Sequence, residues 1–258
     1  AADVPADGAE DDAEDGAEAD IAHGIAVAKP RVSPNPDAGL SVFVAFDTDV
    51  PAFGEVIVET AGEPARRVRG PQDVAATAHE ILVLGLLPDR QYSFTAEATT
   101  DESWGRSPPV KNYPTEKLPK PFPAIEASLP MPEAVPSGYL LFPLSKRLAD
   151  SNVQGSPVPP SDDFPDTLVV TDLAGRVVWY KRFPELTQRI EGFTRLENGN
   201  LIILGDFGLI EFDMSGRVVR HLTKEDMNLA KPLHHDIVSL PNGNFLGITQ
   251  EYRPLSWT

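Results

Sequence analysis

The chain has 258 residues, enough for two domains of ordinary size, and 41% of them are hydrophobic, which suffices for real cores. A formal net charge of -17 argues against binding to nucleic acid or to an anionic membrane surface. The absence of cysteine excludes disulfides, thiolate metal sites and cysteine nucleophiles. No apolar run approaches the roughly 18–20 residues of a membrane span. No signal segment begins the chain, and because it starts at Ala1 rather than Met we expect a processed or trimmed product.

The negative charge is concentrated at the start of the chain. Residues 1–20 hold nine Asp or Glu and no Lys or Arg, which leaves about -8 for the other 238 residues. Residues 1–23 are a low-complexity tract of Ala, Asp, Glu and Gly that cannot bury enough apolar surface to offset the entropy of ordering. We therefore expect a disordered acidic spacer.

Residues 24–118 show the pattern of an all-β domain. Short runs of β-branched and aromatic residues alternate with clusters of Pro, Asn, Asp and Gly, which favour turns. Six runs are expected to form strands: Ile25–Ala28, Leu40–Phe46, Gly54–Glu59, His79–Leu84, Gln91–Ala98 and Pro109–Tyr113. This number and spacing predict a β-sandwich.

One local motif sharpens that prediction. The run Gly85-Leu86-Leu87-Pro88-Asp89-Arg90-Gln91-Tyr92 resembles the "GL-x-P-x-x-x-Y" signature of fibronectin type III domains. The resemblance implies that the Tyr92 hydroxyl closes a corner onto upstream backbone, which is a structural role.

Two segments read as connections. Residues 119–137 are rich in proline, which removes backbone donors and favours extended chain, so we expect a linker. Lys146–Asp166 is rich in Pro, Ser and Asp and reads as a surface loop.

From residue 138 the chain repeats itself. Asp172-Leu-Ala-Gly-Arg-Val-Val recurs at Asp213-Met-Ser-Gly-Arg-Val-Val after 41 residues. Leu196-Glu-Asn-Gly-Asn recurs at Leu240-Pro-Asn-Gly-Asn after 44 residues. A repeat of roughly 40–45 residues with four strands is the pattern of a β-propeller.

The blades can be written out from these markers. The first has runs at Tyr139–Pro143, Leu168–Asp172 and Val177–Phe183. The second has runs at Ile190–Leu196, Leu201–Asp206, Leu209–Asp213 and Val218–Leu222. The third has His235–Leu240 and Phe245–Glu251. About two and a half blades result, so residues 138–258 are expected to be the beginning of a propeller in a longer protein.

The reactive residues gather in the third blade. His234-His235-Asp236 begins its first strand. When the two blades are aligned by the 44-residue repeat, His235 occupies the position of Glu191 in the preceding blade, and His234 occupies the position of Ile190. The first strand of a blade lines the central channel, where side chains of several blades converge. Because neighbouring strand residues face opposite ways, we expect only one of the two imidazoles to face the channel.

Other chemistries lack support. The five histidines do not have H-x-x-x-H spacing, and a structural zinc ion would need four ligands. No GxGxxG, Walker or G-x-S-x-G sequence occurs. Neither a metal nor a cofactor is therefore expected.

Taken together, a β-sandwich, a Pro-rich connection, blades with "D-x-x-G-x-V-V-W" and "L-x-N-G-N", and then His234-His235-Asp236-Ile237-x-x-Leu240-Pro241-Asn242-Gly243-Asn244 resemble the bacterial aryl-sulfate sulfotransferase family. The resemblance covers roughly residues 24–258. It implies a small N-terminal sandwich and a six-bladed propeller that works in the periplasm or at the cell surface. Members move a sulfuryl group from a phenolic sulfate to another phenol without a nucleotide sulfate donor.

By the same resemblance a channel histidine is the nucleophile and forms a transient sulfohistidine, while further His and Arg side chains hold the sulfate oxygens. That nucleophile is expected beyond residue 258. His235, beside Asp236, is the first candidate for a catalytic and substrate-binding residue, and His234 is the second. The partners implied are phenolic sulfates and phenols, and the choice between monomer and homodimer stays open.

Two other functions fit parts of the pattern. A non-catalytic surface or adhesion protein with a fibronectin III-like module and a binding propeller would use the same repeats, with a structural His pair. A quinone-dependent dehydrogenase propeller is a third reading, without a visible quinone-binding feature.

Overall fold

The computed structural model describes residues 24–70, 73–128, 131, 135–144, 165–184, 186, 189–205, 207–251 and 253. The acidic spacer and most of the loop Lys146–Asp166 lie outside these ranges. The described residues are all-β, as predicted, and none of them lies in a helix long and apolar enough to cross a membrane.

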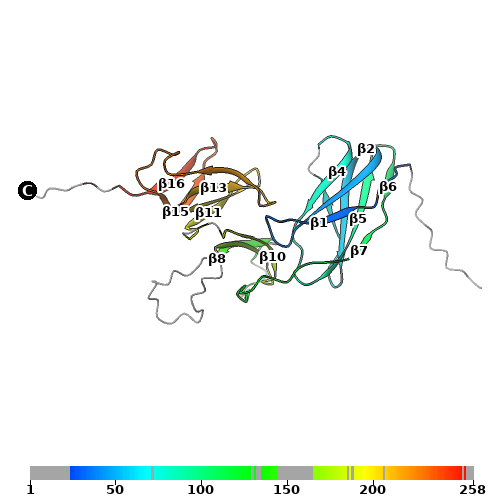
Figure 1. Cartoon of the computed structure of the whole chain (residues 1–258), viewed down its shortest axis with the longest axis horizontal. Helices are drawn as coiled ribbons and strands as arrows, with labels where there is room; N and C mark the ends of the chain where they lie inside the picture. The colour runs from blue at the N-terminus through cyan, green and yellow to red at the C-terminus, as the bar shows by residue number, and fades with distance from the viewer. Residues whose placement is uncertain are drawn as a thin grey trace, which may run out of the picture.

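Seven strands build the N-terminal part of the chain (Figure 1). They are β1 (Arg31–Pro34), β2 (Val42–Thr60), β3 (Arg66–Arg69), β4 (Ala76–Val83), β5 (Gln91–Thr99), β6 (Trp104–Arg106) and β7 (Val110–Pro114). The first half of β2 pairs with β1 and β4. Its second half pairs with β3 and β5, and β5 also pairs with β6 and β7. Because β2 pairs in both layers, the seven strands form one sheet that curls over itself, which is consistent with the predicted sandwich.

The alternation of apolar residues along these strands fills the space between the two layers. Val44 and Phe46 of β2, Ile81 of β4 and Phe94 of β5 are all at most 1% exposed and belong to one cluster. The predicted corner is confirmed, because the Tyr92 hydroxyl accepts a hydrogen bond from the Leu87 N–H at 2.7 Å.

Some strands differ from the prediction. The strand expected at Ile25–Ala28 is wrong, since only Gly24 and Val27 form isolated bridges there, and the first strand is β1 instead. β3 and β6 were not predicted; both are short, and in β3 three Arg residues hide the β pattern. The two strands predicted before and after residue 50 are one strand, because the chain stays extended through a register shift between Asp47 and Ala52.

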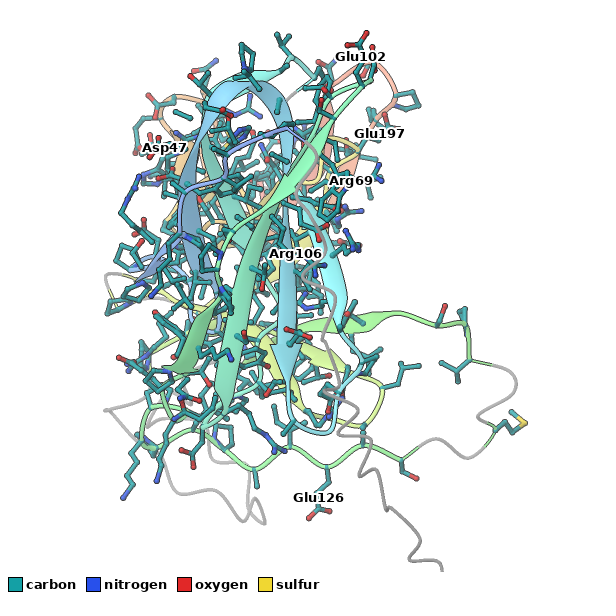
Figure 2. The ribbon with its side chains drawn as sticks, turned by 90° about the vertical axis from the view of Figure 1, so that its right-hand side faces the viewer. Asp47, Arg69, Glu102, Arg106, Glu126 and Glu197 are labelled. Atoms are coloured by element: carbon teal, nitrogen blue, oxygen red, sulfur yellow. The ribbon has the colours of Figure 1, made fainter. Side chains whose placement is uncertain are left out.

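Charged side chains form ion pairs on the outer face of the layer that contains β3, β5, β6, β7 and the second half of β2. Glu55 and Glu97 stand directly opposite each other, which alone would be repulsive. Arg67 bridges both carboxylates and Arg106 binds Glu97 from the other side; Figure 2 shows the sandwich with Arg69 and Arg106 labelled. Burial raises the pKa of Glu97, but the hydrogen bonds from Arg67 and Arg106 outweigh it and hold this pKa below its usual range.

Three further sheets follow the sandwich. The first contains β8 (Tyr139–Leu144), β9 (Thr167–Asp172) and β10 (Val177–Arg182). The second is a four-stranded meander of β11 (Gly192–Arg195), β12 (Leu201–Gly205), β13 (Gly208–Phe212) and β14 (Val218–Leu222). The third is the hairpin of β15 (Leu233–Ser239) and β16 (Phe245–Thr249). These are the predicted strands in the predicted order, consistent with the first blades of a propeller.

The repeated motifs have a structural cause. Asp172 and Asp213 each accept backbone N–H groups two residues ahead, and Asn198 and Asn242 do the same in the hairpin turns. The following glycines need positive φ, for example 89° at Gly199 and 80° at Gly243. The motifs therefore specify turns and carry no chemistry of their own.

The sandwich and the blades share contacts along a seam. The loop between β1 and β2 inserts Ala38 into the cluster that contains Trp179 and Phe212. Backbone Gly39 N–H donates to the Tyr180 carbonyl at 2.8 Å, and the Asn35 side chain donates to the Ser215 carbonyl at 2.8 Å. The predicted domain limits near 118 and 137 stay predictions.

Candidate functional site

The two histidines lie in a break of the β15–β16 ladder. His234 pairs with Ile248, but the next paired residue is Ile237, opposite Gly247. His235 and Asp236 are therefore extra residues of a β-bulge, and His235 has a φ of 68°, which is uncommon for a residue with a side chain. Bulges of this kind re-aim side chains.

The bulge brings both imidazoles together. Their ring centroids lie 4.6 Å apart, with the ring planes at 87°. Both line one cavity of about 210 Å³ together with Glu191, Lys231, Pro232 and Gln250. Both side chains reach one cavity because the strict alternation of regular strands fails across a bulge, and the expectation that one imidazole faces a central channel stays a prediction.

The environments of the two rings differ. His234 is partly buried, and neither of its buried ring nitrogens has a hydrogen-bond partner among the described residues. His235 is exposed. Asp236 accepts the N–H of Ile237 at 2.8 Å, so its described partner is backbone and not an imidazole.

Glu191 is the carboxylate that meets the histidines. It directly precedes β11 and accepts the His235 backbone N–H at 3.3 Å through Oε2. One donor atom each from Glu191, His234 and His235 lies within 4.8 Å of the others. Glu191 and His235 occupy equivalent repeat positions, but nothing in the sequence marks Glu191 as part of the site.

A glycine permits this approach between neighbouring blades. A Cβ on Gly192 would lie 2.4 Å from the His235 carbonyl oxygen, closer than real Cβ atoms come. β11 and β15 can therefore lie side by side only with glycine at this position. The first strands of two successive repeats then supply one cluster.

Residues 143–255 match the family model for arylsulfotransferase (ASST). The predicted resemblance is confirmed over this part of the chain, named the ASST region below. The ASST region contains the whole Glu191, His234 and His235 cluster, and the match supports an aryl sulfotransferase type of function. A comparison with curated proteins gave no match.

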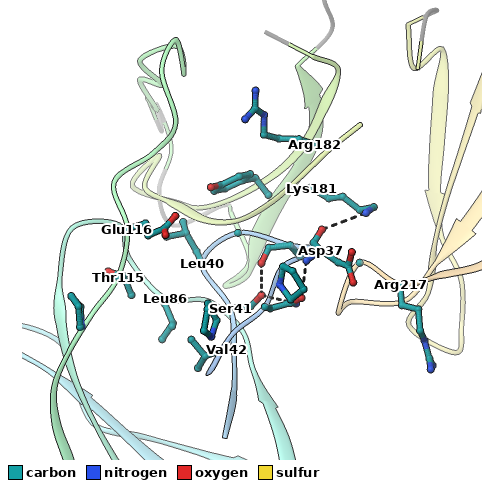
Figure 3. Close-up of a pocket in the computed structure, with 18 of the residues that line it drawn as sticks. Asp37, Leu40, Ser41, Val42, Leu86, Thr115, Glu116, Lys181, Arg182 and Arg217 are labelled. Atoms are coloured by element: carbon teal, nitrogen blue, oxygen red, sulfur yellow. Dashed lines mark hydrogen bonds between the residues drawn. The ribbon is translucent and has the colours of Figure 1, made fainter. Parts of the chain in front are cut away.

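A larger groove of about 960 Å³ lies along the seam between the sandwich and the ASST region (Figure 3). Its lining includes Asp37, Leu40, Tyr180, Lys181 and Arg217. The Lys181 ammonium already donates to the Asp37 carbonyl at 3.3 Å, and Arg217 pairs with Asp213. None of the predicted site residues lines this groove, so we treat it as part of the seam.

Proposed function

We propose that this chain carries the sulfuryl-binding part of an exported aryl-sulfate sulfotransferase. The observation that carries the proposal is the pair of imidazoles in one cavity, within a region that matches the ASST family. The substrates we propose are phenolic sulfate donors and phenol acceptors, and the compartment is the periplasm or the cell surface.

The residue types suit sulfuryl transfer. Charge spreads over the non-bridging oxygens of the transferred group, so cationic donors around them lower the barrier. A protonated imidazole can hold these oxygens or give its proton to the departing phenolate. We assign this role first to His235, which is exposed to the cavity, and second to His234.

The reaction we propose is a double displacement. A nucleophilic imidazole forms an S–N bond while the S–O bond of the donor ester breaks, and the acceptor phenol then takes the sulfuryl group from the sulfohistidine. We place that nucleophile in a longer form of the protein, beyond residue 258.

The exposed apolar side chains of the third blade support the proposal that a longer form of the protein contains a following repeat. In the second blade Ile202 and Leu204 are fully buried, in one cluster with Leu233 and Ile237 of the next repeat. Their equivalents 44 residues later, Leu246 and Ile248, are 62% and 49% exposed. We propose that strands of a following repeat cover this face in the same way.

The proposal is tested by His235→Ala in the longest form of the protein. Transfer from an aryl sulfate to a phenol is expected to fall about 100-fold or more, because general acid–base groups contribute this much. His221→Ala is the matched control, since His221 lies on β14 outside the cluster. Steady-state kinetics with both substrates varied should give the parallel lines of a ping-pong mechanism.

Wild-type transfer by His235→Ala would remove this residue from the mechanism. A longer form that folds but transfers no sulfuryl group would favour the alternative, a non-catalytic surface protein with a binding propeller.

A further inference from the structure

The cluster of Glu191, His234 and His235 has the composition of a metal site. Two imidazole nitrogens and one carboxylate oxygen lie within 4.8 Å of one another and border the same cavity. Zinc bonds of about 2.0–2.1 Å place neighbouring tetrahedral ligands roughly 3.4 Å apart. His235 is exposed, so neighbouring side chains leave its ring room to move toward the other two ligand atoms.

A second, independent observation points to a ligand. Both ring nitrogens of His234 are buried and lack a hydrogen-bond partner among the described residues. A neutral imidazole has one donor and one acceptor nitrogen, and burying both unpaired is unfavourable. A bound cation would engage the acceptor nitrogen.

The backbone is arranged specifically for this convergence. The bulge with φ of 68° at His235 turns two consecutive side chains to one side, and Gly192 lets the Glu191 segment approach. Non-glycine residues at positive φ cost free energy and persist where the surroundings hold them. The same local features assemble all three donors from two repeats.

We propose that Glu191, His234 and His235 bind one divalent transition-metal ion of the Zn²⁺ type. Imidazole nitrogen with a single carboxylate suits Zn²⁺ and its neighbours, whereas Mg²⁺ and Ca²⁺ prefer oxygen ligands throughout. Three protein ligands leave a coordination position open toward the cavity of about 210 Å³.

This inference goes beyond the proposed function and does not depend on it. An imidazole lone pair that holds a cation cannot also carry the proton that holds a sulfuryl oxygen. Zn²⁺ therefore inhibits transfer if the same ring nitrogen serves both roles.

The surrounding cations set a limit on affinity. Arg189 Nη2 lies 3.5 Å from Glu191 Oε1, and Lys231 borders the cavity. Both disfavour an added positive charge, so the site holds its ion through ligand bonds and not through a negative field.

The test is calorimetric titration of the chelator-treated chain with ZnCl₂, and in parallel with MgCl₂. We expect one equivalent of Zn²⁺ to bind and Mg²⁺ not to compete. Glu191→Gln, His234→Ala and His235→Ala should each weaken Zn²⁺ binding about tenfold or more, while His221→Ala leaves it unchanged.

Two results would overturn the metal site. One is the absence of saturable Zn²⁺ binding to the wild-type chain. The other is wild-type affinity in all three ligand variants, which would place the ion elsewhere, for example on the acidic residues 1–20.

Circular dichroism without metal shows whether each variant folds. The visible spectrum of Co²⁺ added to the wild-type chain is a readout that needs no variant, and an octahedral spectrum of free Co²⁺ would contradict the site. If Zn²⁺ does not bind but His235→Ala still abolishes sulfuryl transfer, the metal proposal fails and the proposed function stands.

Discussion

At the scale of single residues, His79 shows how burial couples the sandwich to pH. Its ring is stacked on Phe46 with centroids 4.6 Å apart, and the residue is only 4% exposed. Burial lowers the pKa of His79, against the opposing effects of the Ala76 backbone and the Asp47 charge. The folded protein therefore takes up a proton at this ring less readily than the unfolded chain does.

The sign of the pH effect follows directly. Above the unfolded pKa of about 6.5 the ring is neutral in both states, and its contribution does not vary. As the pH falls below this value, the unfolded chain binds the proton before the folded protein does. The free energy of unfolding therefore decreases as the pH falls, until the pH is below the lowered pKa of the folded state. We predict that urea unfolding between pH 8 and pH 5 shows this loss, and that His79→Gln reduces it. His221→Gln should keep the wild-type slope, and an equal slope in His79→Gln would contradict the assignment.

How well a residue's role could be predicted depended on how local its partners are. Tyr92 contacts backbone five residues away, so a short motif specified its hydrogen bond. Glu191 meets His235 across 44 residues, and only the repeat register relates the two. Asp236 is adjacent to His235 in the sequence, but its carboxylate accepts the backbone N–H of Ile237. Proximity in sequence was misleading there because the bulge decides the direction of each side chain.

At the scale of strands, periodicity predicted the blades better than the sandwich edges. β9 to β14 are bounded by Asp and Asn turns that fix each hairpin, so their order followed from the repeats. β3 and β6 have only four and three residues, too few to show a β period, and they are strands because they pair with β2 and β5. The bulge in β15 has no such sequence marker, since nothing in His-His-Asp announces a positive φ.

Gly192 gives a test at this scale. In Gly192→Ala the new Cβ would meet the His235 carbonyl oxygen at 2.4 Å, and that neighbour is backbone that cannot swing away. β11 and β15 would have to separate, at a cost of about 1–3 kcal/mol in the free energy of unfolding. Chemical denaturation measures this change.

Gly70→Ala is the control for that substitution. Its Cβ would meet Ile81 at 3.5 Å, an ordinary contact, so its effect should stay within about 0.5 kcal/mol. Equal stabilities of the two variants would show that β11 and β15 do not lie in the described contact. Zn²⁺ affinity should fall in Gly192→Ala as well, because Glu191 moves with β11.

At the scale of the whole molecule, the sandwich and the ASST region share packing. Val169 of β9 and Val177 of β10 belong to the same buried cluster as Val44 and Phe94 of the sandwich. Arg176 reaches back to Glu63 while also binding Asp172. The sequence patterns predict the sandwich and the blades as separate parts. They do not predict the contacts between the two, because many of these contacts involve loops and strand edges that have no periodic sequence pattern.

Asn35 also joins the two parts and carries the last prediction. It is 8% exposed, accepts the Asp37 N–H, and donates to Ser41 and to the Ser215 carbonyl of the second blade. Asn35→Ala removes the donor to the Ser215 carbonyl, while the Ser41 hydroxyl keeps its bond to the Ala38 carbonyl, and we expect a cost of about 1–3 kcal/mol. Scanning calorimetry should then show two separate unfolding transitions, the first at a lower temperature than in the wild type. Ser33→Ala is the control, because Ser33 is exposed on the neighbouring β1, and it should keep the wild-type profile. If Asn35→Ala melts like the wild type, the loop does not couple the sandwich to the blades, and the two parts unfold independently of this contact.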